Sequence, residues 1–170
     1  MSGDFDPIAA LRALTDAGVE FVLIGGVAAR IHGSPTLTRD VDICHARDEA
    51  NLERLSGVLQ RLHARLRGVD EDVPFLLDAR TLEAGGSFTF ATDVGDLDLL
   101  AVPAGVDGFE QLERSAVPID LGDLVVKVCD LADLIAMKRA AARPKDLIEV
   151  EVLSALQAEI RGAAPDDDRR

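Results

Sequence analysis

Two short segments that alternate acidic and apolar residues constrain the fold more than any other feature of the chain. Residues 40–43 read Asp-Val-Asp-Ile, and residues 96–99 read Asp-Leu-Asp-Leu. Successive side chains of a β-strand point to opposite faces. A strand therefore places both aspartates of a segment on one face and both apolar residues on the other. The pattern predicts two half-buried strands, each with carboxylates along its open face.

The composition limits the kind of protein and its partners. With 170 residues, 48% of them hydrophobic, the chain can bury one core. Its 31 acidic and 18 basic residues give a formal net charge of −13, which argues against general binding to nucleic acids or anionic membranes. The two cysteines, Cys44 and Cys129, lack zinc-type spacing, which predicts a reduced protein. The acidic N-terminus does not resemble a signal peptide, and no apolar run is long enough to cross a membrane, so we expect a cytoplasmic protein without a membrane span.

Helix caps, glycines and apolar periodicity predict an alternating order of helices and strands. Asp6 and Pro7 begin a first helix that Gly18 ends, and Asp93 with Gly95 forms a hairpin turn. The predicted strands cover residues 20–24, 39–44, 87–91, 96–102, 116–120 and 124–128. The predicted helices cover residues 7–17, 27–33, 52–66, 108–114, 131–142 and 146–160.

This order of elements predicts the α/β (α+β) class, with a small mixed β-sheet flanked by helices. A core over residues 1–128 precedes a C-terminal helical segment, 129–162, which packs on that core. Pro144 interrupts the helical segment, because a proline disfavours helical geometry in the residue before it. Residues 163–170 are acidic and polar, which is typical of a disordered tail.

The aspartates of the first alternating segment, Asp40 and Asp42, lie at about 7 Å between alpha carbons on a strand. Such carboxylates repel each other, and a hard divalent cation such as Mg²⁺ removes the repulsion and suits oxygen ligands. A neighbouring strand can supply a third carboxylate. Asp98 is the preferred candidate because leucines anchor its strand, and Asp96 and Asp93 are the alternatives. Solvated acids on an exposed strand edge are the competing interpretation.

A glycine turn, Gly25 and Gly26, lies between the first predicted strand and a short helix. Free backbone N–H groups at a helix start attract phosphate, and glycine lets the backbone approach it closely. Much later in the chain, Lys138 belongs to a basic segment that either contacts a triphosphate or forms a solvated helix end. His45, just beyond the first acidic strand, is a further residue that could approach the site.

The spacing of these motifs is similar to that of a known family. The sequence Ile-Gly-Gly at 24–26, followed by 13 residues and then Asp-Val-Asp-Ile, resembles the signature of the polymerase-β-like nucleotidyltransferase superfamily. The resemblance continues through residues 95–100. It reaches residues 133–147, which resemble the C-terminal motif of small bacterial nucleotidyltransferases related to abortive-infection and toxin–antitoxin systems.

The resemblance implies a nucleotidyltransferase fold and a two-metal transfer of a nucleoside monophosphate from an NTP, such as ATP, to a hydroxyl acceptor. It implies that Asp40, Asp42 and Asp98 are catalytic and hold two Mg²⁺ ions. The nucleotide-binding residues that it implies are Gly25, Gly26, Thr38, Lys138 and Asp146.

The acceptor stays open at this point. An RNA or tRNA end, a protein hydroxyl, and a small molecule such as an antibiotic all fit the implied chemistry. The resemblance also implies a possible role as the toxin of a toxin–antitoxin system, with an antitoxin as partner. The alternative of a different class is a non-catalytic module within such a pair.

Overall fold

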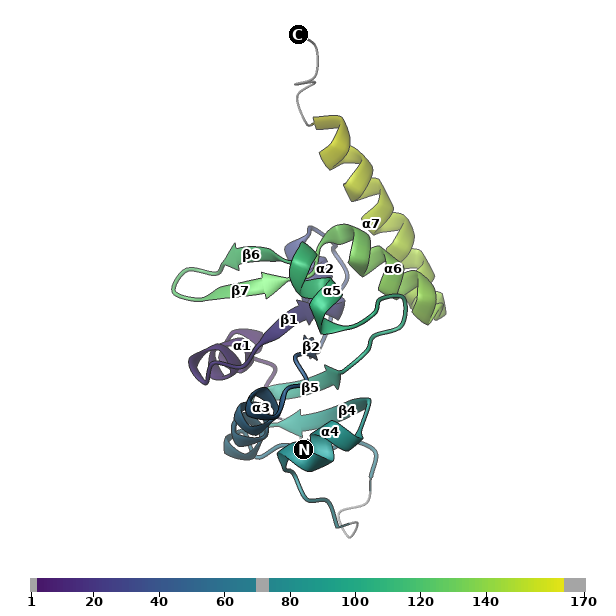
Figure 1. Ribbon diagram of the computed structural model, residues 1–170. Coiled ribbons are helices and arrows are strands. Elements are labelled where there is room, and N and C mark those ends of the chain that lie inside the picture. The colour runs from purple at the N-terminus through teal and green to yellow at the C-terminus, as the bar shows by residue number, and fades with distance from the viewer. Residues whose placement is uncertain (1–2, 70–73, 164–170) are drawn as a thin grey trace.

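Seven strands form one mixed β-sheet in the computed structural model, which describes residues 3–69 and 74–163 (Figure 1). The strands are β1 (Phe21–Ile24), β2 (Asp40–His45), β3 (Arg65–Leu66), β4 (Ser87–Thr92), β5 (Gly95–Leu100), β6 (Val117–Asp120) and β7 (Val125–Val128). The helices are α1 (Pro7–Asp16), α2 (Gly25–Ile31), α3 (Glu49–Arg61), α4 (Ala79–Ala84), α5 (Phe109–Ser115), α6 (Leu131–Ala141) and α7 (Pro144–Ala163). The predicted class, a mixed sheet flanked by helices, is confirmed.

The strand order places the two acidic segments at the centre of the sheet. Across the sheet the strands follow the order β3-β4-β5-β2-β1-β7-β6. β2 pairs with β5 in parallel and β1 pairs with β7 in parallel, while the other neighbours are antiparallel. The register between β2 and β5 sets Asp42 beside Asp98 and Asp40 beside Asp96. Because paired residues share a face of the sheet, all four carboxylates lie on the same side.

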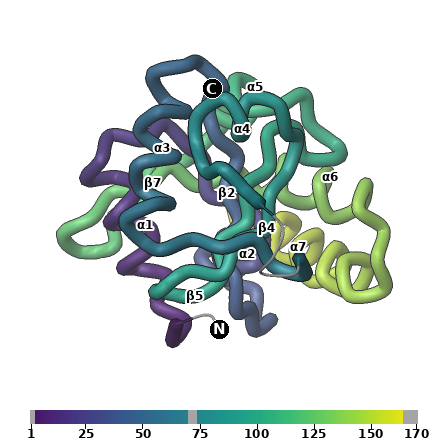
Figure 2. The backbone as a smooth tube through the Cα atoms, turned by 90° about the horizontal axis from the view of Figure 1, so that it is seen from below, coloured from purple at the N-terminus to yellow at the C-terminus, as the bar shows by residue number. Residues whose placement is uncertain are grey.

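The helices cover both faces of this sheet. Figure 2 shows α1 and α3 on one side of the strands and α6 and α7 on the other. Both groups contribute apolar side chains to the core, including Leu11 and Leu55 from the first group and Leu134 and Leu153 from the second. Among the described helices, none has both the length and the apolar character that crossing a membrane requires.

The long helix predicted over residues 52–66 was wrong at its C-terminal end. α3 stops at Arg61, and the backbone of His63 adopts a left-handed φ of 49°. Leu66 belongs to β3, where it pairs with Phe90. Leu66 lies at a helical interval from Leu62 in sequence, but periodicity alone cannot distinguish one more helical turn from a short strand that packs on the same core.

Two short elements were not predicted at all. β3 has two residues, which are too few to show an alternating pattern, and α4 has one buried residue, Leu82. α4 begins at a cap that the sequence does contain, because the Asp78 side chain accepts a hydrogen bond from the Thr81 N–H at 2.8 Å. A single cap followed by six residues did not suffice to identify a helix.

The C-terminal part of the described chain consists of α6 and α7, which pack against each other, and α6 also contacts α2. The Asp130 side chain caps α6, and Pro144, the predicted break, is the first residue of α7, a position that proline tolerates well. α7 runs through Ala163, the first residue of the predicted tail, and the rest of that tail lies outside the described residues. The division into a core and a helical segment at residue 128 stays a prediction.

Candidate active site

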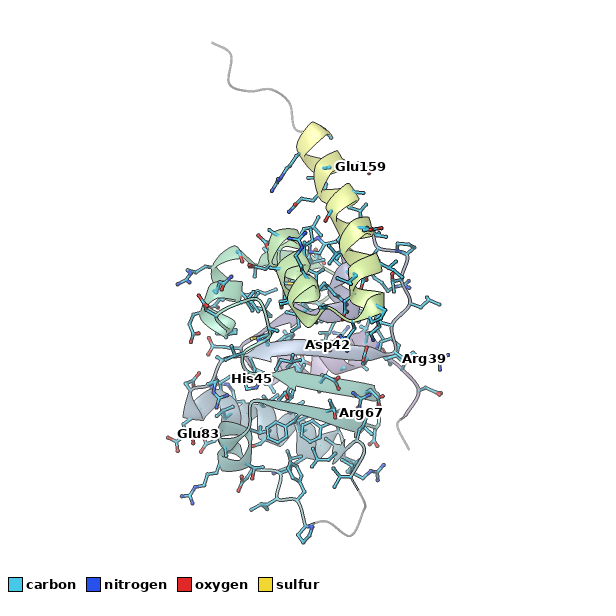
Figure 3. The ribbon with its side chains drawn as sticks, turned by 90° about the vertical axis from the view of Figure 1, so that its right-hand side faces the viewer. Arg39, Asp42, His45, Arg67, Glu83 and Glu159 are labelled. Atoms are coloured by element: carbon cyan, nitrogen blue, oxygen red, sulfur yellow. The ribbon has the colours of Figure 1, made fainter. Side chains whose placement is uncertain are left out.

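Three carboxylates converge where β2 and β5 run side by side. Asp40, Asp42 and Asp98 each offer one carboxylate oxygen, and these atoms all lie within 4.8 Å of one another. All three residues are partly buried. In Figure 3, Asp42 lies on β2 beneath the C-terminal helices. The alternation predicted for both segments is thus present, and it brings together the three residues that the sequence singled out.

The glycine turn packs directly against these carboxylates. Gly25 has a φ of +68°, and a Cβ added there would lie 2.1 Å from Asp42 Oδ2. A Cβ added to Gly26 would lie 2.6 Å from the Thr38 hydroxyl oxygen, and the Gly26 N–H donates a hydrogen bond to Asp42. A side chain at either position would collide with the site, so close contact requires both glycines, and the left-handed backbone of Gly25 adds a second reason at that position.

Thr38 orients the first carboxylate of the group. Its Oγ1 donates a hydrogen bond to Asp40 Oδ1 at 2.6 Å. The donor belongs to the loop before β2 and the acceptor to its first residue, so the contact is local and independent of other elements. Thr38 thereby fixes the rotation of the Asp40 carboxylate, and it links the loop to the glycine turn.

The electrostatics of the three carboxylates favour a bound cation. Burial raises the pKa of Asp42 to about 7, and the negative charges of Asp40 and Asp98 add to this effect. Burial also raises the pKa of Asp98, although the charge of Arg67 opposes it. Carboxylates held this close cannot all ionise without a compensating charge. Oxygen ligands of this kind suit a hard divalent cation such as Mg²⁺, so the residues present fit the metal that the resemblance implies.

Arg67 is a residue of this site that the sequence did not identify. Its Nη1 donates a hydrogen bond to Asp96 Oδ2 at 2.7 Å, and its Nη2 donates to Asp98 Oδ1. Arg67 follows directly after β3, the unpredicted strand, and only the pairing of β3 with β4 brings it near β5. No signal in the sequence could have found it.

Lys138 lies between two buried carboxylates of α7. Its Nζ is 2.8 Å from Glu149 Oε2 and 3.5 Å from Asp146 Oδ1. The Arg143 Nε donates a second hydrogen bond to Asp146, at 2.6 Å. The Ser34 hydroxyl donates to Glu149 Oε1 at 3.3 Å, which ties the loop before β2 to α7. Glu149 was not predicted, although it lies one helical turn after Asp146 and could have been found from that spacing.

The Asp146 side chain is 0% exposed, so its charge depends on its neighbours. Burial raises the pKa of Asp146, but the hydrogen bond and charge of Arg143, together with the charge of Lys138, outweigh burial. The net pKa of Asp146 lies below its usual value, and the carboxylate is ionised at neutral pH. The aspartate therefore holds two cations in place at the side of the site.

One cavity of about 270 Å³ is lined by the carboxylate cluster, the glycine turn, Lys138, Asp146 and Glu149. The residues that the resemblance implied for the site all line it: Gly25, Gly26, Thr38, Asp40, Asp42, Asp98, Lys138 and Asp146. Basic side chains of Arg143 and Lys145 line the same cavity, and an apolar wall is contributed by Leu100, Pro103 and Met137. The cavity thus brings carboxylates, cations and apolar surface together in one space.

His45 does not belong to this site. Within the described part of the chain it is absent from the cavity lining, and it is 2% exposed at the far end of β2. Its Nδ1 lies 3.1 Å from the Ala46 carbonyl oxygen, and burial lowers its pKa. The hypothesis that His45 approaches the carboxylates was wrong, because its position along β2 is offset from Asp40 and Asp42 by an odd number, which turns its side chain to the other face.

Comparison with known proteins places the fold but not the family. No protein-family model matches the chain, and no curated protein sequence matches it. Among solved structures, the chain is similar to the lincosamide antibiotic adenylyltransferase LnuA bound to lincomycin, with a TM-score of 0.60 and 12% sequence identity over 91% of this chain and 99% of that chain.

A second similarity is to the antibiotic-resistance factor ANT(2'')-Ia. Its solution structure has a TM-score of 0.51 and 16% identity over 90% of this chain and 88% of that chain. Its crystal structure in complex with adenylyl-2''-tobramycin has a TM-score of 0.50 and 16% identity over 90% of this chain and 93% of that chain. From these likenesses, this chain has the nucleotidyltransferase fold.

Proposed function

We propose that this protein is a metal-dependent nucleotidyltransferase that transfers a nucleoside monophosphate from an NTP, such as ATP, to a hydroxyl acceptor. The observation that carries the proposal is the cluster of Asp40, Asp42 and Asp98, with oxygens within 4.8 Å of one another. The cluster opens into the cavity that also holds the glycine turn and Lys138. Carboxylates, a glycine turn at a helix start and cations in one cavity are the groups that a metal–triphosphate complex needs.

The three aspartates would hold Mg²⁺, and Thr38 would keep the Asp40 carboxylate turned toward it. When bound, the metal would supply neutralisation of phosphate charge and a lower pKa for the acceptor hydroxyl. Gly25 and Gly26 would let the triphosphate approach the backbone beside Asp42. We place two ions in the site by resemblance to the family.

Lys138 and Asp146 would serve the nucleotide in different ways. The Lys138 ammonium has three N–H donors, and two of them face Glu149 and Asp146, so one donor is left for a phosphate oxygen. The Asp146 side chain is 0% exposed, and it would act by holding Lys138 and Arg143 in position. We therefore propose residues 1–128 as the catalytic core and residues 129–162 as the segment that supplies cations to the triphosphate.

A small-molecule hydroxyl is the acceptor that the observations favour. The net charge of −13 disfavours binding to the RNA backbone. The solved structures of similar fold include one bound to lincomycin and one with adenylyl-2''-tobramycin. An RNA or tRNA end, a protein hydroxyl, and a non-catalytic role with an antitoxin partner are the alternatives.

The test is incubation of the purified protein with each α-labelled NTP and Mg²⁺, in separate reactions with aminoglycosides, lincosamides, total RNA, whole lysate or no acceptor. We expect labelled product from the wild type and none from Asp42→Asn. This substitution removes the negative charge that would bind the metal and keeps the size of the side chain. Loss of one metal ligand should slow transfer by about 4 kcal/mol or more in the barrier. Transfer by Asp42→Asn at the wild-type rate would contradict the site. Binding of NTP with Mg²⁺ but no label in any reaction would favour the non-catalytic module.

A further inference from the structure

The second acidic segment does not place both of its aspartates in the carboxylate cluster. In the parallel register Asp96 lies beside Asp40, and Asp98 lies beside Asp42. Among the described residues, the group that converges within 4.8 Å contains Asp98 and not Asp96. Asp96 is instead held by Arg67 Nη1 at 2.7 Å. Both aspartates of the Asp-Leu-Asp motif therefore contact Arg67, but only Asp98 also belongs to the carboxylate cluster of the described residues.

Arg67 is anchored so that it reaches both aspartates at once. Its backbone N–H donates to the Thr89 carbonyl at 2.9 Å, and Thr89 is the residue of β4 that pairs with Asp98 of β5. The side chain crosses β4, and its two terminal nitrogens contact two carboxylates that are two residues apart on one strand. A planar guanidinium can make this forked contact, whereas the single ammonium of a lysine cannot match its geometry.

The three side chains are shielded enough for the contact to fix geometry. Arg67 is 32% exposed, Asp96 24% and Asp98 15%, and ion pairs that are partly buried are screened by solvent much less than surface pairs. A guanidinium that holds Oδ1 of Asp98 restricts the rotation of that carboxylate. The direction of the carboxylate toward Asp40 and Asp42 then depends on Arg67, and the orientation of Arg67 depends on Asp96.

We propose that Arg67 and Asp96 form a clamp that positions Asp98 for metal binding in the proposed nucleotidyltransferase site. Arg67 is a positioning residue: it touches a proposed metal ligand and acts through it. The clamp gives Asp96 a role outside the metal cluster and explains why the strand keeps two aspartates. The inference rests on the proposed function only through the identity of the bound cation.

The test is a titration of the full chain with Mn²⁺ alone, followed by the electron paramagnetic resonance signal of free Mn²⁺. Changes to the partners of a metal ligand typically weaken metal binding by about 10- to 100-fold. We expect the Mn²⁺ affinity to fall by an amount in that range in both Arg67→Ala and Arg67→Lys, since lysine keeps the positive charge but cannot contact both aspartates as the guanidinium does. Asp96→Asn should weaken binding less, and it should add little in the Arg67→Ala background, because the two residues act in series. Arg61→Ala, on the exposed surface of α3, is the matched control for loss of one positive charge.

The possible outcomes separate the clamp from the proposed function. If Arg67→Ala binds Mn²⁺ more tightly and Arg67→Lys binds as the wild type does, Arg67 acts only by its charge and the clamp is wrong. If all Arg67 variants lose thermal stability but keep the wild-type Mn²⁺ affinity, the contact is merely structural, which also overturns the clamp. If the wild type and Asp42→Asn bind Mn²⁺ equally weakly, the metal site itself fails, and the proposed function fails with it.

Discussion

At the scale of single residues, the site depends on contacts so close that adding or removing a single side-chain atom would break them. The absence of a side chain at Gly25 is what allows the Asp42 carboxylate to lie against the turn. The hydroxyl of Thr38 is what holds Asp40 at 2.6 Å. The glycines and aspartates were predictable from the sequence, because a strand, a glycine turn and alternating acids each have a local pattern. Arg67 was not, because its role depends on a pairing between strands.

The first expectation concerns Gly25→Ala. A left-handed φ costs a residue with a side chain about 1–3 kcal/mol, and the new Cβ would collide with the Asp42 carboxylate. We expect a loss of unfolding free energy of at least this size, measured by urea denaturation, together with weaker metal binding. Gly86→Ala is the matched control, because a Cβ there meets nothing within 4 Å, and it should leave both quantities almost unchanged. Equal effects of the two substitutions would contradict the close contact.

The second expectation concerns pH. The pKa of Asp42 is raised to about 7 in the folded protein, against about 3.9 in an unfolded chain. Between these values the folded state binds more protons than the unfolded state, so the metal-free protein should lose stability as pH rises from about 4 to about 7, by at most about 4 kcal/mol. Metal must displace the same proton, so its apparent affinity should rise about tenfold per pH unit up to pH about 7 and then level off.

Calorimetric Mg²⁺ titrations at a series of pH values from 5.5 to 8.5, chosen to span the pKa of about 7, check this expectation. Asp42→Asn has no proton to displace at this position, so its residual affinity should depend little on pH in this range. A wild-type affinity that does not change with pH would show that the carboxylates are already ionised without metal.

At the scale of elements, the site is assembled by α6 and α7 as much as by the sheet. The cap of α6 and the proline break before α7 were predictable from Asp130 and Pro144, since both follow local rules. The predicted course of α3 beyond Arg61 was wrong, and β3 was missed. A local cap or break thus identified α6 and α7 but not the short α4, whereas a two-residue strand exists only through its pairing with β4.

The third expectation tests the contact between α6 and α7. Lys138 is 13% exposed and lies between Asp146 and Glu149, which are 0% and 6% exposed. Removing one partner of a buried ion pair costs about 3–5 kcal/mol, because it leaves a buried charge without compensation. We expect Lys138→Ala to lower the unfolding free energy by an amount in this range and to raise the KM for NTP.

Lys127→Ala is the matched control for Lys138→Ala. Lys127 pairs with Glu113 at 2.6 Å, and their side chains are 53% and 36% exposed, so its removal should cost about 0–1 kcal/mol. Full stability in Lys138→Ala combined with a raised KM would show that Lys138 serves the nucleotide alone and does not hold α7. Unchanged kinetics together with a large loss of stability would show that Lys138 holds α7 and does not contact the nucleotide.

At the scale of the whole molecule, the acidic charge relates to the choice of acceptor, and the cavity relates to the binding of NTP. The formal charge of −13 disfavours a large polyanion as the acceptor. The cavity, about 270 Å³ in volume, is lined by the cations Lys138, Arg143 and Lys145 as well as by the carboxylates. A triphosphate brought to these carboxylates without metal would be repelled. NTP and metal are therefore expected to bind together.

The most direct test of this requirement is the thermal stability of the protein with NTP and Mg²⁺, compared with NTP in EDTA. NTP with Mg²⁺ at 100 times the dissociation constant should stabilise the fold by about 2.7 kcal/mol, and NTP in EDTA should give little change. Asp40→Asn should remove most of the gain, whereas Asp96→Asn, outside the cluster, should keep most of it. Equal stabilisation by NTP in EDTA, or a larger loss from Asp96→Asn than from Asp98→Asn, would contradict a metal-bridged site on Asp40, Asp42 and Asp98.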